Sequence, residues 1–104
     1  MKLGFVDEER FAMAFSRDKF RQNKWGKVRI RIELERRGLE SSTIEGGLGS
    51  IPENEYLETI QRLVDKKKST LRDTNKFILH QKVVRYLVGK GFEADLVWDQ
   101  LNDL

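Results

Sequence analysis

Basic side chains are concentrated between Arg17 and Arg37, where nine lysines and arginines are accompanied by only three acidic residues. Ammonium and guanidinium groups attract phosphates and carboxylates, so this cluster predicts an anionic partner, either nucleic acid or an acidic protein surface. Ten residues are candidate contacts to DNA or to a protein partner: Arg10, Arg17, Lys19, Arg21, Lys24, Lys27, Arg29, Arg31, Arg36 and Arg37.

No comparable set of residues predicts catalysis. His80 is the only histidine, cysteine is absent, and no nucleophile can be matched with a general base. The glycines of GGLGS at 46–50 lack the Gly-Lys-Ser/Thr ending of a phosphate-binding loop, which favours a linker. The sequence therefore predicts a protein that is not an enzyme, with no catalytic residue, cofactor, metal site or small-molecule substrate.

The composition fits one small domain. The 104 residues are 38% hydrophobic and 36% charged, without an apolar run long enough to cross a bilayer. Residues 51–104 contain nine basic and nine acidic residues, so the net charge of +3 comes from the first half. The absence of cysteine and of a visible signal peptide suits the cytoplasm, and no membrane partner is expected.

Helix signals dominate the first half of the chain. Asp7 is placed to cap a helix over about 8–23 that has two glutamates in its first turn, and capping explains these carboxylates better than a metal site does. A second helix is expected from about residue 27 to Gly38, which can adopt the left-handed conformation beyond a helix end. A third is expected over 41–48.

The second of these helices has a competing pattern. Its apolar residues alternate with charged ones, as they would in a half-buried strand: Val28, Ile30, Ile32 and Leu34. An internal repeat favours the helix, because RRGLESSTIEGGL at 36–48 matches GKGFEADLVWDQL at 89–101. The same shift aligns Ile30 with Val83, in a run whose spacing is plainly helical.

The repeat predicts an all-α fold made of two tandem three-helix repeats. Residues 1–50 form the repeat with the basic face, and residues 51–104 form the second. The second repeat is expected to have a longer loop between its first two helices, within KKKSTLRDTNKFI. Each repeat is too small to bury its apolar faces alone, so the two are expected to depend on each other.

Helical spacing groups some of the basic candidates. Arg10, Arg17 and Arg21 fall in one stripe of the first helix, and Arg29 and Arg36 share a face of the second. The alternative is a solvated surface held by i, i+4 ion pairs worth only ~0.2–0.5 kcal/mol each. Those pairs would be Arg29–Glu33 and Arg31–Glu35, and they leave most of the basic residues unpaired. For Lys66–Lys68, partner contact and plain solvation are both open.

The apolar residues divide into a core and two exceptions. Trp25, between two basic helices, can stack on a base or pack into the helix junction. Val28 and Ile32 form a second apolar stripe, which either packs on a neighbouring helix or meets a partner. Nine helix-spaced residues are expected in the core: Phe11, Phe15, Leu57, Ile60, Leu63, Val83, Leu87, Phe92 and Trp98.

Three segments together resemble the bacterial RecX proteins, which regulate the RecA recombinase: DEERFAMAFSRDKF, WGKVRIRIELERRGL and KVVRYLVGKGFEADLVWDQL. The resemblance covers Gly4 to Leu101 and corresponds to the second and third of the three repeats usual in that family. Residues 2–5 resemble the end of a first repeat.

The resemblance implies a protein that binds the RecA filament together with its single- or double-stranded DNA. It also implies lower RecA ATP hydrolysis and strand exchange. The charge pattern by itself leaves two alternatives open. One is an independent helical module that binds DNA directly, with the steep salt dependence of counterion release. The other is an enzyme or scaffold whose basic face is incidental.

Overall fold

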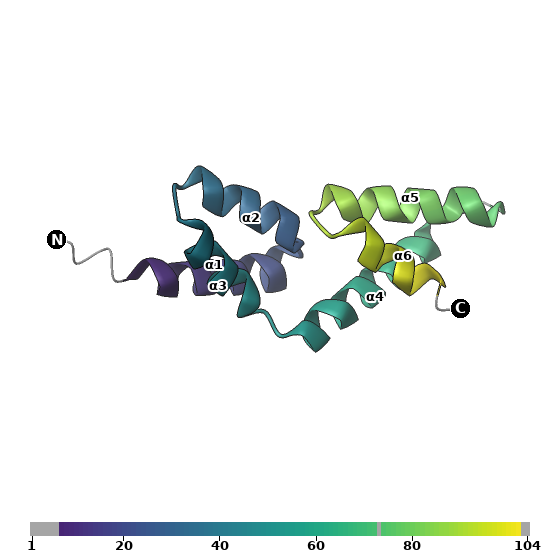
Figure 1. Cartoon of the computed structure of the whole chain (residues 1–104). Coiled ribbons are helices and arrows are strands. Elements are labelled where there is room, and N and C mark those ends of the chain that lie inside the picture. Colours follow the sequence, from purple (N-terminus) through teal and green to yellow (C-terminus); the bar gives the residue numbers. More distant parts are fainter. Residues whose placement is uncertain (1–6, 73, 103–104) are drawn as a thin grey trace.

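The computed structural model describes residues 7–72 and 74–102, which form six helices and no strand. The first three are α1 (Glu8–Asn23), α2 (Lys27–Arg36) and α3 (Ser41–Gly49), and the other three are α4 (Glu53–Thr70), α5 (Lys76–Gly89) and α6 (Ala94–Asn102). Figure 1 shows two groups of three helices arranged end to end. The predicted all-α fold with two three-helix repeats is confirmed. The apolar residues at positions 3 and 5, assigned to a preceding repeat, lie outside the described residues.

Residues 27–36 form the helix α2, as the internal repeat predicted, although their alternating apolar pattern resembles that of a strand. Ile30 and Leu34 are fully buried, whereas Val28 and Ile32 are 45% and 43% exposed. One apolar stripe therefore packs into the core while the other stays largely exposed at the surface.

The two repeats end their second helices in the same way. Gly38 follows α2 with φ +84°, and Gly91 follows α5 with φ +98°. The next residue donates a backbone hydrogen bond back to the helix in both cases, from Leu39 to Leu34 at 3.3 Å and from Phe92 to Leu87 at 3.1 Å. Glycine suits both positions because a side chain makes the left-handed conformation unfavourable.

The expectation that the polar start of KKKSTLRDTNKFI is a loop is wrong, because α4 continues to Thr70. The connection to α5 is residues 71–75, only slightly longer than the turn 24–26 of the first repeat. The additional residues instead lengthen the helices, to 18 residues in α4 against 16 in α1 and to 14 in α5 against 10 in α2. Lysines are compatible with the last turns of α4 because they lie at the negative end of the helix dipole.

Two further expectations about α1 are wrong. Asp7 occupies the N-cap position, but its side chain accepts no capping hydrogen bond. Phe11 is 40% exposed instead of buried, because α3 packs against the flank of α1 that carries Ala12 and Ser16. The other eight predicted core residues are buried or pack partly buried against the core.

The two repeats meet through their turns (Figure 1). The Gly26 N–H donates to the Lys90 carbonyl at 2.8 Å, and the Val28 N–H donates to the Gly91 carbonyl at 3.0 Å. These bonds join the start of α2 to the end of α5. The approach is so close that a Cβ added at Gly26 would lie 2.2 Å from the backbone of Gly91.

Tyr56, near the start of α4, fills the space beneath these turns. Its ring lies between Phe20 and Phe92, with centroid separations of 5.4 and 5.5 Å. Its hydroxyl accepts from the Lys27 N–H at 2.9 Å and donates to Glu93 Oε1 at 2.5 Å. Burial, followed by the hydrogen bond to Glu93, raises the pKa of Tyr56 far above its usual value, so the hydroxyl stays protonated.

Candidate functional site

Three aromatic rings form a row along α1 and the turn that follows it. The ring centroids of Phe11 and Phe15 are 5.5 Å apart, and those of Phe15 and Trp25 are 6.4 Å apart. Phe11 is the most exposed of the three, and Phe15 and Trp25 also pack against the core. The row is therefore anchored in the fold while it remains accessible at the surface.

Basic side chains lie over each of these rings. Lys19 Nζ is 5.5 Å from the Phe15 centroid and 5.1 Å from the Trp25 centroid. The guanidinium carbon of Arg29 lies 4.2 Å from the Trp25 centroid, and that of Arg37 lies 4.9 Å from Phe15 and 5.4 Å from Phe11. We call these six residues the aromatic–basic face: Phe11, Phe15, Lys19, Trp25, Arg29 and Arg37.

The cations of the aromatic–basic face remain available to an anion. Lys19, Arg29 and Arg37 form no ion pair with any carboxylate of the described residues. Cation–π contact holds them at the ring faces without neutralising their charge. Of the two roles that the sequence left open for Trp25, the structure shows packing at the helix junction, and stacking on a base stays a prediction. Charges beside exposed rings suit a partner with phosphates and stacked bases.

Three of the ten candidates are instead paired with carboxylates. Arg21 donates to Glu55 from Nε at 2.8 Å and from a terminal nitrogen at 2.9 Å, which links α1 to α4. Arg31 pairs with Glu45 of α3. Arg36 pairs with Glu33 at 3.2 Å. The i, i+4 pairs of the alternative interpretation, Arg29 with Glu33 and Arg31 with Glu35, are not among these ion pairs.

The Arg21–Glu55 pair gives a prediction for NMR titration. The hydrogen bond from Arg21, and then its charge, lower the pKa of Glu55. In the Arg21→Gln variant we expect the pKa of Glu55 to rise toward its ordinary value, while the pKa of Glu45 stays lowered by Arg31. The NMR chemical shifts of the two side-chain carboxyl carbons, followed against pH, measure both pKa values. An unchanged Glu55 titration in the variant would contradict the pairing. The pKa of Glu55 is lower in the folded protein than in the unfolded chain. The Arg21–Glu55 pair therefore stabilises the fold above the pH range where unfolded glutamates titrate, and this stabilisation is lost as the pH falls through the folded pKa.

The remaining four candidates lie on other surfaces. Arg10 is exposed, and Arg17 is partly buried with its Nε donating to the Met13 carbonyl at 3.4 Å. Lys27 Nζ lies 4.7 Å from the Tyr56 ring centroid. Lys24, in the turn after α1, lines a cleft between the two repeats, and its Nζ donates to the Arg21 carbonyl at 2.5 Å. The ten residues are thus distributed over several surfaces, and only Lys19, Arg29 and Arg37 gather on the aromatic row.

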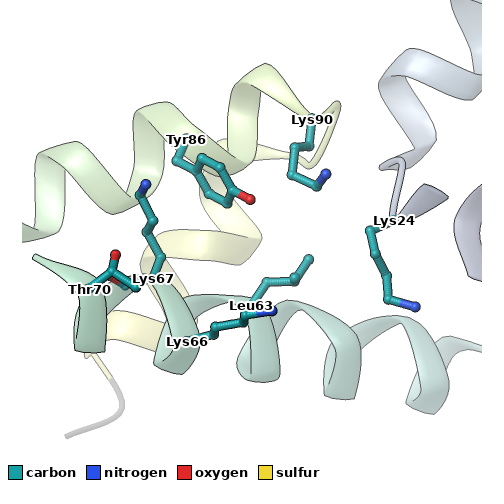
Figure 2. Close-up of a pocket in the computed structure, with 7 residues that line it drawn as sticks. All are labelled: Lys24, Leu63, Lys66, Lys67, Thr70, Tyr86 and Lys90. Carbon is teal, nitrogen blue, oxygen red and sulfur yellow. The ribbon is translucent and has the colours of Figure 1, made fainter.

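The cleft that Lys24 lines also includes residues that were not among the ten candidates. It has a volume of about 340 Å³, and Figure 2 shows the side chains that surround it. Its lining residues come from both repeats: Lys24, Leu63, Lys66, Lys67, Thr70, Tyr86 and Lys90. The balanced charge of the second half concealed this cluster, and the lysine run at 66–68 was its only local signal.

Within the described ranges there is no group of three or more metal-binding side chains. His80 lies within α5, partly buried against Trp98 of α6, with ring centroids 6.4 Å apart. Partial burial, and then the charges of Lys68 and Lys76, lower its pKa. None of the helices formed by the described residues is long and apolar enough to span a membrane.

Comparison with known proteins identifies both repeats. Residues 7–48 match the family described as RecX, second three-helix domain, and residues 53–101 match RecX, third three-helix domain. No solved structure matches the chain.

Several curated relatives bear the name Regulatory protein RecX. The protein from Caldanaerobacter subterraneus subsp. tengcongensis is 35% identical over 99 residues, which are 94% of this chain and 47% of the relative. The one from Clostridium acetobutylicum is 29% identical over 107 residues, 99% of this chain and 49% of the relative. The chain therefore spans about half the length of these relatives. With both of its repeats matched in order and six helices in the corresponding places, the chain belongs to the RecX family.

Proposed function

We propose that the chain binds the RecA–DNA nucleoprotein filament and lowers the recombinase and ATPase activity of RecA. The observation that carries this proposal is the aromatic–basic face, in a chain whose relatives are named regulatory proteins. The protein acts by binding and not by catalysis. A cytoplasmic location is part of the proposal, because the filament assembles on chromosomal DNA.

The aromatic–basic face can contact the filament in two ways. Lys19, Arg29 and Arg37 attract the phosphates of the bound DNA, and the exposed edge of the aromatic row offers a stacking surface to an unpaired base. Val28 and Ile32, on the same helix as Arg29, are exposed apolar residues that suit contact with protein. Helix α2 thus presents both types of contact to a partner made of protein and DNA.

A triple variant tests this role. Lys19→Ala, Arg29→Ala and Arg37→Ala together should raise the protein concentration needed to inhibit RecA ATP hydrolysis on single-stranded DNA by about 10-fold or more, because three charge contacts are lost. The salt dependence of binding should flatten by about one unit of slope per lost phosphate contact.

The control removes three positive charges elsewhere. Lys68, Arg72 and Lys76 lie in the last turn of α4, in the connection 71–75 and at the start of α5. Changing all three to alanine should leave inhibition close to that of the unchanged chain. Circular dichroism checks that both variants are folded. If the first variant still inhibits at full strength, the aromatic–basic face is not the contact surface.

The same face favours a second candidate function, an independent nucleic-acid-binding module. This function requires tight binding to bare DNA with a steep salt dependence. A chain that binds bare DNA but leaves RecA ATP hydrolysis unchanged would have this function. Binding that needs the assembled filament would exclude it.

A further inference from the structure

The lysine cleft between the repeats is separate from the aromatic–basic face, and we propose that it is a second binding site. The ligand class is a polyphosphate backbone, specifically the phosphodiester backbone of a single nucleic-acid strand. This inference does not rest on RecA regulation, because it concerns direct binding of the strand.

The charge of the cleft is the first argument. Lys24 comes from the first repeat, Lys66 and Lys67 from α4, and Lys90 from the end of α5, as Figure 2 shows. None of the lining residues is acidic. None of the four lysines forms an ion pair with a carboxylate in the part of the chain that the structure describes. Four ammonium groups around one concave space repel one another, and a bound anion would relieve that repulsion.

The shape of the cleft favours a strand over a single phosphate. A neighbouring hollow of about 210 Å³ shares Lys24, Leu63 and Lys66 with the cleft and adds Thr59 and Arg62. Because they share these residues, the two hollows adjoin along α4, and each has basic residues in its lining. A chain of phosphates can meet several of these charges at once, whereas a mononucleotide occupies only part of this space.

The residue types favour nucleic acid over an acidic protein. Lysine is depleted in protein–protein interfaces, which depend on buried aromatic and aliphatic anchors. Here Leu63 and Tyr86 are the only large apolar or aromatic side chains, and Tyr86 lies close to two ammonium groups. Lys67 Nζ is 4.4 Å and Lys90 Nζ 5.9 Å from its ring centroid. Lysine is a compact point charge without the fixed fork of arginine, so these contacts suit a phosphate backbone more than a particular base.

The backbone of Lys24 is the second, independent argument. It has φ +57°, the only positive φ among the non-glycine residues that the structure describes. It ends α1 in the left-handed conformation, where glycine is normally preferred. The Lys24 side chain lines the cleft while its Nζ donates to the Arg21 carbonyl at 2.5 Å, so the fold keeps a lysine, without a carboxylate partner, at a position that glycine would suit.

Fluorescence anisotropy with a labelled deoxythymidine oligonucleotide, without RecA, tests the site. Lys66→Gln, Lys67→Gln and Lys90→Gln together should weaken binding by about 10-fold or more at moderate salt and reduce the salt slope by about one unit for each lost phosphate contact. The matched control, Lys68→Gln, Arg72→Gln and Lys76→Gln, removes the same charge outside the cleft and should weaken binding by no more than about 3-fold. Equal losses in the two variants would mean that only net charge matters, and would overturn the site.

Competition separates the possible ligands. An unlabelled oligonucleotide should displace the probe, whereas ATP and polyglutamate at the same charge concentration should not. Displacement by ATP at that concentration would overturn the assignment to a strand, and displacement by polyglutamate would overturn the assignment to nucleic acid. The same measurement in the Lys19, Arg29 and Arg37 triple-alanine variant isolates the cleft from the aromatic–basic face. The site and the RecA proposal can therefore fail independently.

Lys24→Gly provides a sharper variant. It should raise the thermal midpoint of unfolding because glycine adopts φ +57° without strain, and yet weaken oligonucleotide binding by several-fold because a cleft charge is lost. A purely structural role for Lys24 predicts no loss of binding. Unchanged affinity in this more stable variant would overturn the inclusion of Lys24 in the site.

Discussion

Gly26→Ala is expected to destabilise the protein by about 3 kcal/mol or more, because the added methyl group meets backbone atoms that cannot rotate away. The new Cβ would lie 2.2 Å from the Gly91 carbonyl carbon and oxygen and 2.3 Å from the Phe92 nitrogen. The two repeats must separate to admit it, and this breaks the hydrogen bonds from Gly26 to Lys90 and from Val28 to Gly91. Urea unfolding followed by circular dichroism measures the effect, and the midpoint of thermal unfolding should fall by roughly 12 °C or more.

Gly46→Ala is the matched control. Gly46 lies within α3, and a Cβ added there has nothing within 4 Å. Alanine is the better helix former, so this change should stabilise the protein by about 0.5–1 kcal/mol. A Gly26→Ala variant as stable as the unchanged chain would mean that the repeats do not dock through these turns.

Tyr56→Ala is expected to cost about 3–5 kcal/mol, the range for truncating a buried aromatic side chain. Tyr56 is only 2% exposed, and its ring joins Phe20 of the first repeat to Phe92 of the second. The loss should also uncouple the repeats, so that unfolding monitored at Trp25 and at Trp98 no longer coincides. Single-tryptophan variants followed by fluorescence during urea unfolding can measure this.

Tyr56→Phe separates the hydroxyl from the ring. It keeps the aromatic contacts but leaves the Lys27 N–H and the Glu93 carboxylate without this partner, which should cost about 1–3 kcal/mol. Tyr86→Ala is the control, because Tyr86 is 40% exposed and its truncation should have a much smaller effect on stability. Equal stability of Tyr56→Ala and Tyr86→Ala would show that Tyr56 does not connect the repeats.

The turn between α1 and α2 links stability to both proposed surfaces. Its three consecutive residues have different roles: Lys24 lines the cleft, Trp25 carries Lys19 and Arg29 on its ring, and Gly26 contacts the second repeat. Because one short turn positions all three, a change that displaces Gly26 also moves the cleft and the aromatic–basic face. Binding assays on Gly26 variants therefore report stability and function together, whereas substitutions at Lys24 or Arg29 separate them.

The sequence by itself determined the helices of this protein. Glycines with the right spacing predicted the ends of α2 and α5, and the internal repeat decided that α2 is a helix despite its alternating pattern. These features are local, because helix periodicity and a left-handed glycine act over a few residues. The same local signals did not predict that the helix continues past Lys66, because a polar run is compatible with an exposed helix end as well as with a loop.

Only the tertiary structure decided which basic residues lie together. The sequence placed ten candidates on the first half, but three of these pair with Glu33, Glu45 and Glu55, and two of those carboxylates lie on other helices. A segment of zero net charge contributes most of the lysine cleft, because folding brings together Lys66, Lys67 and Lys90 from α4 and the end of α5. The number of charges along a chain says nothing about the distances between their side chains. In this protein those distances depend on how the two repeats dock, through the contact of Gly26 with Gly91 and through Tyr56.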